Sequence, residues 1–141
     1  MSHHISEAGL IEKIFHKSKT IAVVGLSPNA ARPSYGVARF LQNAGYRIIP
    51  VNPTEAEILG KKCYPSLSSI PDDIKIDVVD IFRRPEFVPD IVRKAIQRGV
   101  SFIWLQDGVI SEEAWDLAVK AQIPIVMDDC MYRQGIHYIN K

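Results

Sequence analysis

The stretch Thr20-Ile21-Ala22-Val23-Val24-Gly25 is a short apolar run rich in β-branched residues, and it predicts a strand buried on both faces. A loop at residues 26–33 follows it. We expect Ser34 to be the N-cap of the next helix, and Gly45 to end it. One face of that helix is apolar and comprises Val37, Ala38, Phe40, Leu41 and Ala44. A buried strand followed by an amphipathic helix predicts the start of a parallel α/β fold.

The same alternation continues along the chain. Further apolar runs predict strands at residues 46–52, 76–82, 101–106 and 123–127. Helices are predicted at 6–17 with Ser6 as N-cap, at about 87–98, and after Ser111, which is a second N-cap candidate. The expected fold class is therefore α/β, a Rossmann-like three-layer sandwich with a five-stranded parallel sheet. We expect residues 1–141 to form one domain.

Composition limits the classes of partner. The chain has 17 Lys plus Arg and 16 Asp plus Glu, so its formal net charge of +1 argues against a general nucleic-acid binder. Its apolar runs are too short to span a membrane, and its first residues do not resemble a signal peptide, so we expect a cytoplasmic protein with no membrane partner. The two cysteines and four histidines lack metal-ligand spacing, and no metal site is expected.

The near-neutral total contains a local asymmetry. Residues 13–54 include no acidic residue and six basic ones, which are Lys13, Lys17, Lys19, Arg32, Arg39 and Arg47. The same segment holds the loop after the first predicted strand and the end of the second. We therefore expect the asymmetry to mark a site for one small polyanion.

The first loop is a candidate phosphate site, because it ends at a helix amino terminus where backbone N–H groups and the helix dipole favour anions. Ser27 and Ser34 add hydroxyl groups, and Arg32 adds a fixed positive charge. The alternative is that Ser34 only caps its helix and Arg32 is solvated. Gly25 is not followed by the glycines of a dinucleotide fingerprint or of a P-loop.

The end of the second predicted strand carries Asn52 where a nicotinamide dinucleotide site would place an acidic residue. An asparagine can bond a hydroxyl or a phosphate without repelling it. Later strands are followed by two further polar loops, Phe82-Arg83-Arg84-Pro85 and Gln106-Asp107-Gly108-Val109. Phe82 could stack on a base or belong to the core, and Arg84 favours a solvated position. No catalytic set is evident, and Cys130 after the last strand is either a small buried residue or a thiol facing the site.

These loops also carry a family resemblance, through the motifs Ile21-Ala22-Val23-Val24-Gly25-Leu26-Ser27, Arg32-Pro33-Ser34-Tyr35, Val51-Asn52-Pro53, Asp77-Val78-Val79-Asp80-Ile81-Phe82-Arg83 and Trp104-Leu105-Gln106-Asp107-Gly108-Val109. The chain resembles the small stand-alone coenzyme A-binding proteins, which are similar to the amino-terminal domain of the succinyl-coenzyme A synthetase α subunit. The resemblance implies that Gly25, Ser27, Arg32, Pro33 and Ser34 hold the pyrophosphate region of coenzyme A. It implies that the rest of the ligand follows Asn52, Pro53, Phe82, Arg83, Val88, Gln106, Gly108 and Val109.

Three functions follow from these observations. The favoured one is a non-catalytic protein that binds coenzyme A or acyl-CoA. The alternative is the CoA-binding half of an acyl-CoA ligase or transferase that acts with a partner chain. A weaker third is an NAD-binding redox sensor, which would need the missing glycine fingerprint. Exposed apolar surface could support a homodimer, although no motif specifies one.

Overall fold

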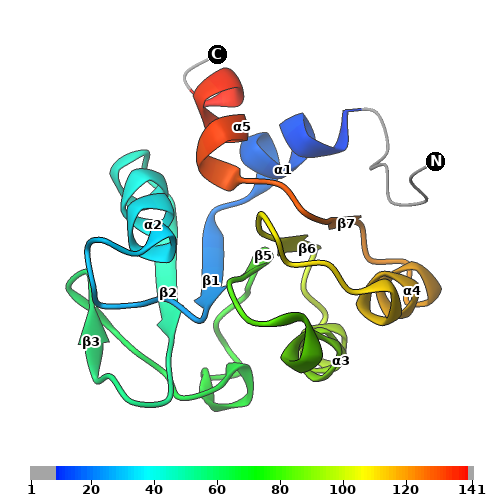
Figure 1. Cartoon of the computed structure of the whole chain (residues 1–141), viewed down its shortest axis with the longest axis horizontal. Helices are drawn as coiled ribbons and strands as arrows, with labels where there is room; N and C mark the ends of the chain where they lie inside the picture. Colours follow the sequence, from blue (N-terminus) through cyan, green and yellow to red (C-terminus); the bar gives the residue numbers. More distant parts are fainter. Residues whose placement is uncertain (1–8, 140–141) are drawn as a thin grey trace.

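Strand β1 (Thr20–Val24) lies inside a five-stranded sheet of the computed structural model, which describes residues 9–139 (Figure 1). The strand order is β2-β1-β5-β6-β7, and every neighbouring pair is parallel. The other four strands are β2 (Arg47–Val51), β5 (Val78–Ile81), β6 (Phe102–Leu105) and β7 (Ile125–Val126). The predicted Rossmann-like sandwich with a five-stranded parallel sheet is confirmed.

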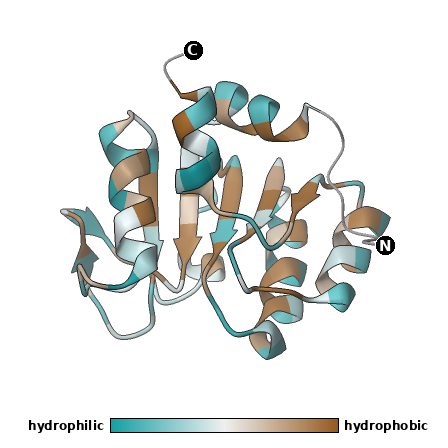
Figure 2. Ribbon diagram, turned by 45° about the horizontal axis from the view of Figure 1, so that its top comes forward, coloured by the Kyte–Doolittle hydropathy of each residue, from teal (hydrophilic) through white to brown (hydrophobic). Residues whose placement is uncertain are grey.

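Helices cover both faces of this sheet. One face packs against α1 (Leu10–Lys17), α2 (Pro33–Asn43) and α5 (Met131–Tyr138). The other packs against α3 (Val88–Arg98), α4 (Glu112–Lys120) and the 3-10 turn η1 (Leu67–Ser69). Alternate strand residues supply the two cores, so that Ile21 and Val23 face α2 while Ala22 and Val24 face α3. Figure 2 shows the hydrophobic colouring concentrated along the strands.

Strand β2 is one of the two edge strands of the sheet, and it contains Pro50. The Pro50 carbonyl accepts from the Tyr64 N–H at 3.0 Å, on the side away from β1. In a strand the N–H and C=O of one residue point to the same side, so the missing Pro50 N–H would not have paired with β1. This explains why a proline is tolerated here.

Several predicted boundaries differ from the structure. Helix α2 begins at Pro33 with Arg32 as N-cap, so the prediction that Ser34 is the cap is wrong. Proline suits the first helical position, because the N–H that it lacks would have no acceptor within the helix there. Helix α1 begins at Leu10, and its predicted cap Ser6 lies outside the described residues. The tail forms α5, and a small hairpin of β3 (Glu57–Ile58) and β4 (Lys61–Lys62) was not predicted. A 3-10 turn, η2 (Pro85–Phe87), precedes α3.

The strand order identifies where a ligand would bind. The chain leaves β1 for α2 on one face of the sheet and leaves β5 for α3 on the other, although β1 and β5 are neighbours. Between their carboxyl ends no helix crosses, and in this class of fold such a switch point forms the ligand crevice. Across residues 9–139, no helix has the length and apolar character needed to span a membrane.

Candidate functional site

Gly25 sits at the switch point and brings the loops after β1 and β5 together. Its φ is 86°, and its N–H donates to the Val51 carbonyl at 3.0 Å. A Cβ at this position would lie 2.3 Å from the Phe82 carbonyl oxygen and 2.9 Å from Arg83 Cδ. Both the positive φ and the close approach require glycine, so a side chain here would force the two loops apart.

Two serines hold the loop between β1 and α2 in shape. The Ser27 N–H donates to Ser34 Oγ at 3.0 Å, and the Asn29 N–H donates to Ser27 Oγ at 3.1 Å. Ser34 is buried, and its own N–H has no acceptor among the described residues, because it lies in the first turn of α2. The loop therefore leaves a helix amino terminus with a free donor beside the switch point, which favours an anion.

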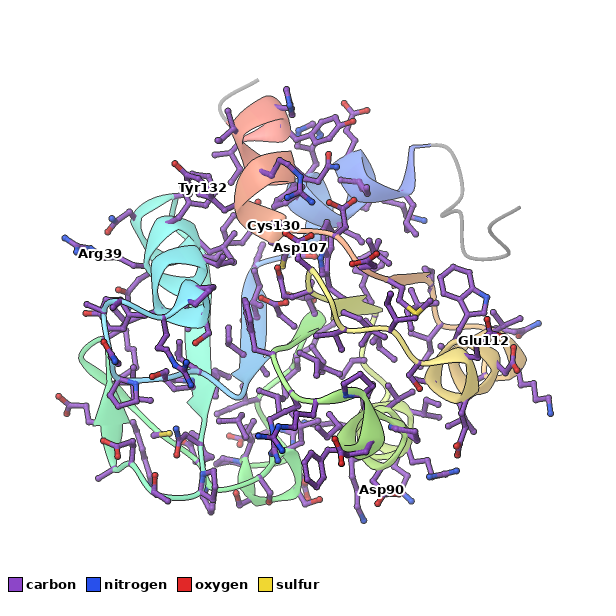
Figure 3. The ribbon with its side chains drawn as sticks, in the orientation of Figure 1. Arg39, Asp90, Asp107, Glu112, Cys130 and Tyr132 are labelled. Atoms are coloured by element: carbon purple, nitrogen blue, oxygen red, sulfur yellow. The ribbon has the colours of Figure 1, made fainter. Side chains whose placement is uncertain are left out.

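Two cavities open at the carboxyl ends of the strands, and both are lined by Gly25 and Arg83. The first, called the α2 cavity below, has a volume of about 570 Å³. Its lining also includes Ser27, Arg32, Pro33, Ser34, Val37, Phe82, Arg84, Pro85, Gln106, Asp107, Gly108, Val109 and Cys130. Figure 3 shows two of these lining residues, Asp107 and Cys130, near the start of α5.

The α2 cavity is positively charged. Arg32, Arg83 and Arg84 line it, and none of the three forms a salt bridge with any residue between 9 and 139. The guanidinium of Arg83 lies over the Phe87 ring at 4.6 Å from its centroid. The lining carboxylate, Asp107, accepts two hydrogen bonds from Arg133 at 3.0 and 2.9 Å, and this pairing lowers its pKa. Its charge is therefore compensated from outside the cavity.

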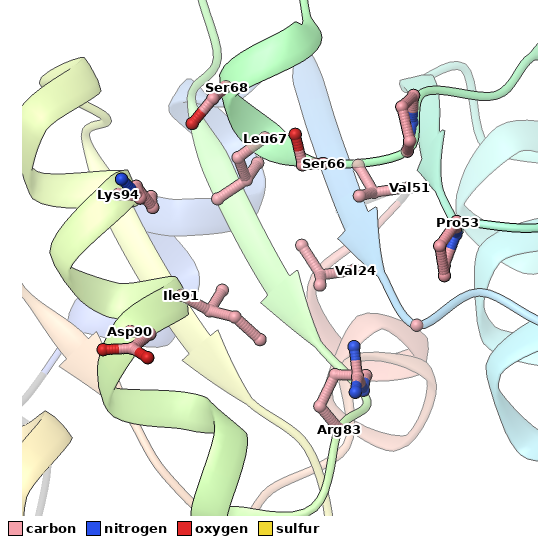
Figure 4. Close-up of a pocket in the computed structure, with 12 residues that line it drawn as sticks. Val24, Val51, Pro53, Ser66, Leu67, Ser68, Arg83, Asp90, Ile91 and Lys94 are labelled. Carbon is pink, nitrogen blue, oxygen red and sulfur yellow. The ribbon is translucent and has the colours of Figure 1, made fainter.

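The second cavity, called the α3 cavity, is mostly apolar and has a volume of about 300 Å³. Figure 4 shows Val24, Leu67 and Ile91 directed into it from β1, η1 and α3. Its rim is polar, with Ser66 and Ser68 on one side and Lys94 on another. The remaining lining residues are Val51, Pro53, Pro65 and Asp90. A flat apolar group with a few polar edges suits this space.

A buried pair lies beneath the α2 cavity. Gln106 lines the cavity although it is 2% exposed, and its Nε2 donates to Asp80 Oδ1 at 2.6 Å. Asp80 is fully buried, and burial raises the pKa of this carboxyl group from 3.8 to about 7, while the bond from Gln106 opposes the shift. Its second oxygen, Oδ2, has no hydrogen-bond partner among the described residues. A buried polar atom left in this state is uncommon in folded proteins.

Eleven of the thirteen residues predicted for the site line one or both cavities. Asn52 and Val88 line neither. The Asn52 amide donates to the Leu26 carbonyl at 2.9 Å and accepts from the Thr54 N–H at 2.8 Å, so it ties the end of β2 to the first loop. Val88 is completely buried at the start of α3. Both residues support the segments that form the crevice without lining a cavity themselves.

Sequence reasoning missed the η1 and α3 side of the site, including Leu67, Ile91 and Lys94. It also predicted that the basic residues at positions 13–54 mark the site. Of the six basic residues at positions 13–54, Arg32 is the one that lines either cavity. Lys13, Lys17, Lys19 and Arg47 lie in α1 or at the amino ends of β1 and β2, and Figure 3 shows Arg39 pointing outward from α2.

Comparison with known proteins places this geometry among relatives. A family model described as a CoA binding domain matches residues 19–135. YneT of Bacillus subtilis, an uncharacterized protein, is 41% identical over 121 residues, which are 86% of this chain and 88% of YneT. A hypothetical protein from Pyrococcus horikoshii OT3 has a similar structure, with a TM-score of 0.89 and 37% identity over 99% of this chain and 100% of that one.

Larger proteins contain a similar segment. The ADP-forming acetate–CoA ligase II of Archaeoglobus fulgidus is 31% identical over 97 residues. These residues are 67% of this chain but 14% of the ligase, so the likeness concerns a small part of that protein.

Proposed function

The chain belongs to the family of CoA binding domains, and we propose that it binds coenzyme A or acyl-CoA without itself catalysing a reaction. The observation that carries the proposal is the meeting of two unlike cavities at Gly25 and Arg83. Coenzyme A has a flat purine at one end, an amide chain at the other and a pyrophosphate between them. An apolar cavity and a cavity lined by three arginines, joined at Gly25 and Arg83, match that order.

In this proposal the pyrophosphate lies at the amino terminus of α2. The free Ser34 N–H and the unpaired Arg32 supply donors there, and the helix dipole adds to the attraction. Arg83 lies between the two cavities and contributes a second charge. We assign no catalytic residue, since no histidine lines either cavity in the described part of the chain.

The purine is assigned to the α3 cavity, between the aliphatic side chains of Leu67 and Ile91. Lys94 and Arg83 at its rim would receive the 3′-phosphate of the ribose. Asp90 also lies at this rim, but its carboxylate bonds the Arg93 guanidinium at 2.9 Å. The amide chain and thiol then extend through the α2 cavity toward Gln106 and Cys130.

Native mass spectrometry of the purified protein tests the ligand class. Retention of coenzyme A or an acyl derivative supports the proposal, and a retained NAD would refute it. Titration calorimetry with coenzyme A and dephospho-coenzyme A tests the finer assignment. The 3′-phosphate carries close to two negative charges, so dephospho-coenzyme A should bind more weakly, and equal affinities would refute a dedicated 3′-phosphate contact.

A second candidate is the CoA-binding half of a ligase or transferase, and the likeness to the acetate–CoA ligase favours it. That function requires a partner chain that supplies the nucleotide site and the nucleophile. Acyl-CoA formation from acetate and a nucleoside triphosphate by the isolated chain would contradict the non-catalytic proposal. The predicted homodimer and cytoplasmic location remain predictions.

A further inference from the structure

We infer that Asp80 is the positioning residue of the α2 cavity: it holds the Gln106 side chain so that the amide oxygen faces the ligand, which must then offer an N–H or O–H donor at that point. This inference rests on the proposed function for the identity of the ligand. Pantetheine amides and hydroxyls are donors of the required kind.

The orientation of Gln106 follows from the chemistry of its partner. An ionised carboxylate accepts hydrogen bonds and cannot donate them, so it selects the NH₂ side of the amide. The Gln106 Nε2–Asp80 Oδ1 distance is 2.6 Å, and a hydrogen bond to an ionised carboxylate is stronger than one between neutral groups. With the nitrogen turned down toward β5, the planar amide presents its oxygen on the other side, where Gln106 lines the cavity.

The charged residues that line the cavity beside Gln106 are Arg32, Arg83, Arg84 and Asp107, while Asp80 is the charged residue that bonds its amide. In the sheet it lies between Val23 of β1 and Trp104 of β6, which carry no charge. Asp129 of the β7–α5 connection and Arg133 of α5 pair with each other at 2.9 Å. The titratable residues in the core cluster on this face are tyrosines and cysteines, namely Tyr35, Tyr46, Cys63, Cys130 and Tyr138. The exposed Arg39 of α2 points away from the sheet (Figure 3).

Protonation of Asp80 would remove its selection of the NH₂ side of the Gln106 amide. A carboxylic acid can donate to the Gln106 oxygen, and the amide would then turn its NH₂ group toward the cavity. Because burial raises the pKa of Asp80 to about 7, this change falls within an accessible pH range. The proton would then lie on Asp80 Oδ1, the oxygen that faces Gln106. A ligand donor would then meet a donor, and its hydrogen bond would be lost.

The test combines two measurements on the full chain. The first uses no ligand: nuclear magnetic resonance follows the Gln106 side-chain NH₂ signal, assigned by its disappearance in Gln106→Ala, across the pH range. In the wild-type protein this signal should shift with the same midpoint as the Asp80 carboxyl carbon. In Asp80→Asn, which has the same shape and does not ionise, the shift should be absent. A Gln106 signal that does not shift as Asp80 ionises in the wild-type protein would overturn the inference.

The second measurement is the affinity for dephospho-coenzyme A near pH 6 and near pH 8, since this probe lacks the 3′-phosphate that itself titrates near pH 6. Wild-type affinity should fall about fivefold at the lower pH, the worth of one neutral hydrogen bond. Asp80→Asn should show no such fall. Asp77→Asn is the matched control, because Asp77 belongs to the same segment but accepts bonds from the Lys19 and Thr20 N–H groups at the opposite end of the sheet.

The outcomes separate the two proposals. Identical pH profiles for the wild-type protein and Asp80→Asn would overturn the positioning role and leave coenzyme A binding intact. Failure of coenzyme A and of dephospho-coenzyme A to bind at any pH would refute the proposed function. The resonance measurement would still decide whether Asp80 orients Gln106.

Discussion

Replacing Asp80 by asparagine should stabilise the protein at neutral and alkaline pH. The carboxyl group is fully buried, and its pKa is raised from 3.8 to about 7. The folded protein therefore holds this proton more tightly than the unfolded chain does. The contribution of Asp80 to the free energy of unfolding is highest below about pH 4, falls as the pH rises toward 7, and is constant above that range. About three pKa units correspond to about 4 kcal/mol of lost stability at high pH.

Asparagine removes this loss because it cannot ionise, and its amide oxygen still accepts from Gln106. Urea unfolding near pH 5 and near pH 8 measures the effect. Between these conditions the wild-type protein should lose about 2 to 3 kcal/mol relative to Asp80→Asn, because every other titrating group is common to both proteins and cancels. Equal m values would verify that both unfold in the same way. A stability difference that does not change with pH would refute the reasoning, since it would mean that folding leaves the pKa of Asp80 unaltered.

Three further substitutions test other parts of the site. Arg32→Ala should weaken coenzyme A binding by about 1.5–3 kcal/mol in calorimetry, and an unchanged Kd would place the pyrophosphate elsewhere. Gly25→Ala should lower both the Tm and the affinity for coenzyme A. Gly45 has a φ of 107° but open space around it, so Gly45→Ala should lower the Tm alone. Equal affinities for the two variants would contradict the close approach at Gly25. Arg98→Ala should destabilise the fold by about 2–4 kcal/mol in urea unfolding, because its guanidinium donates to four carbonyls around η1; a change below about 0.5 kcal/mol would contradict this.

The layered fold could be predicted because a parallel strand buried on both faces has a distinctive composition. The runs around Val24, Ile81 and Leu105 are continuous and apolar, and each is followed by a polar loop. Helix ends were also predicted correctly where a single residue determines them through local hydrogen bonds or backbone conformation. Ser111 Oγ accepts from the Ala114 N–H at 3.1 Å, and Gly99 ends α3 with a φ of 74°.

The errors arose where tertiary contacts decide. Ser34 has the composition of an N-cap, but its hydroxyl is used by the Ser27 N–H across the loop. The α3 cavity depends on η1 lying against α3, and that contact joins segments separated by residues 70–87. Its lining residues, such as Leu67 and Ile91, look like ordinary core residues in the sequence. No local pattern distinguishes an apolar side chain that faces a cavity from one that faces the core.

Charge pairing explains how a nearly neutral chain presents a basic crevice. The carboxylates close to the site have cationic partners outside it: Asp107 bonds Arg133, and Asp90 bonds Arg93. The arginines that line the cavities, including Arg32 and Arg83, have no such partner within residues 9–139. The number of basic residues at positions 13–54 therefore does not explain the charge of the crevice, since most of those residues lie elsewhere. The positive field at the crevice depends on which charges the fold leaves unpaired, and a linear count contains no information about pairing.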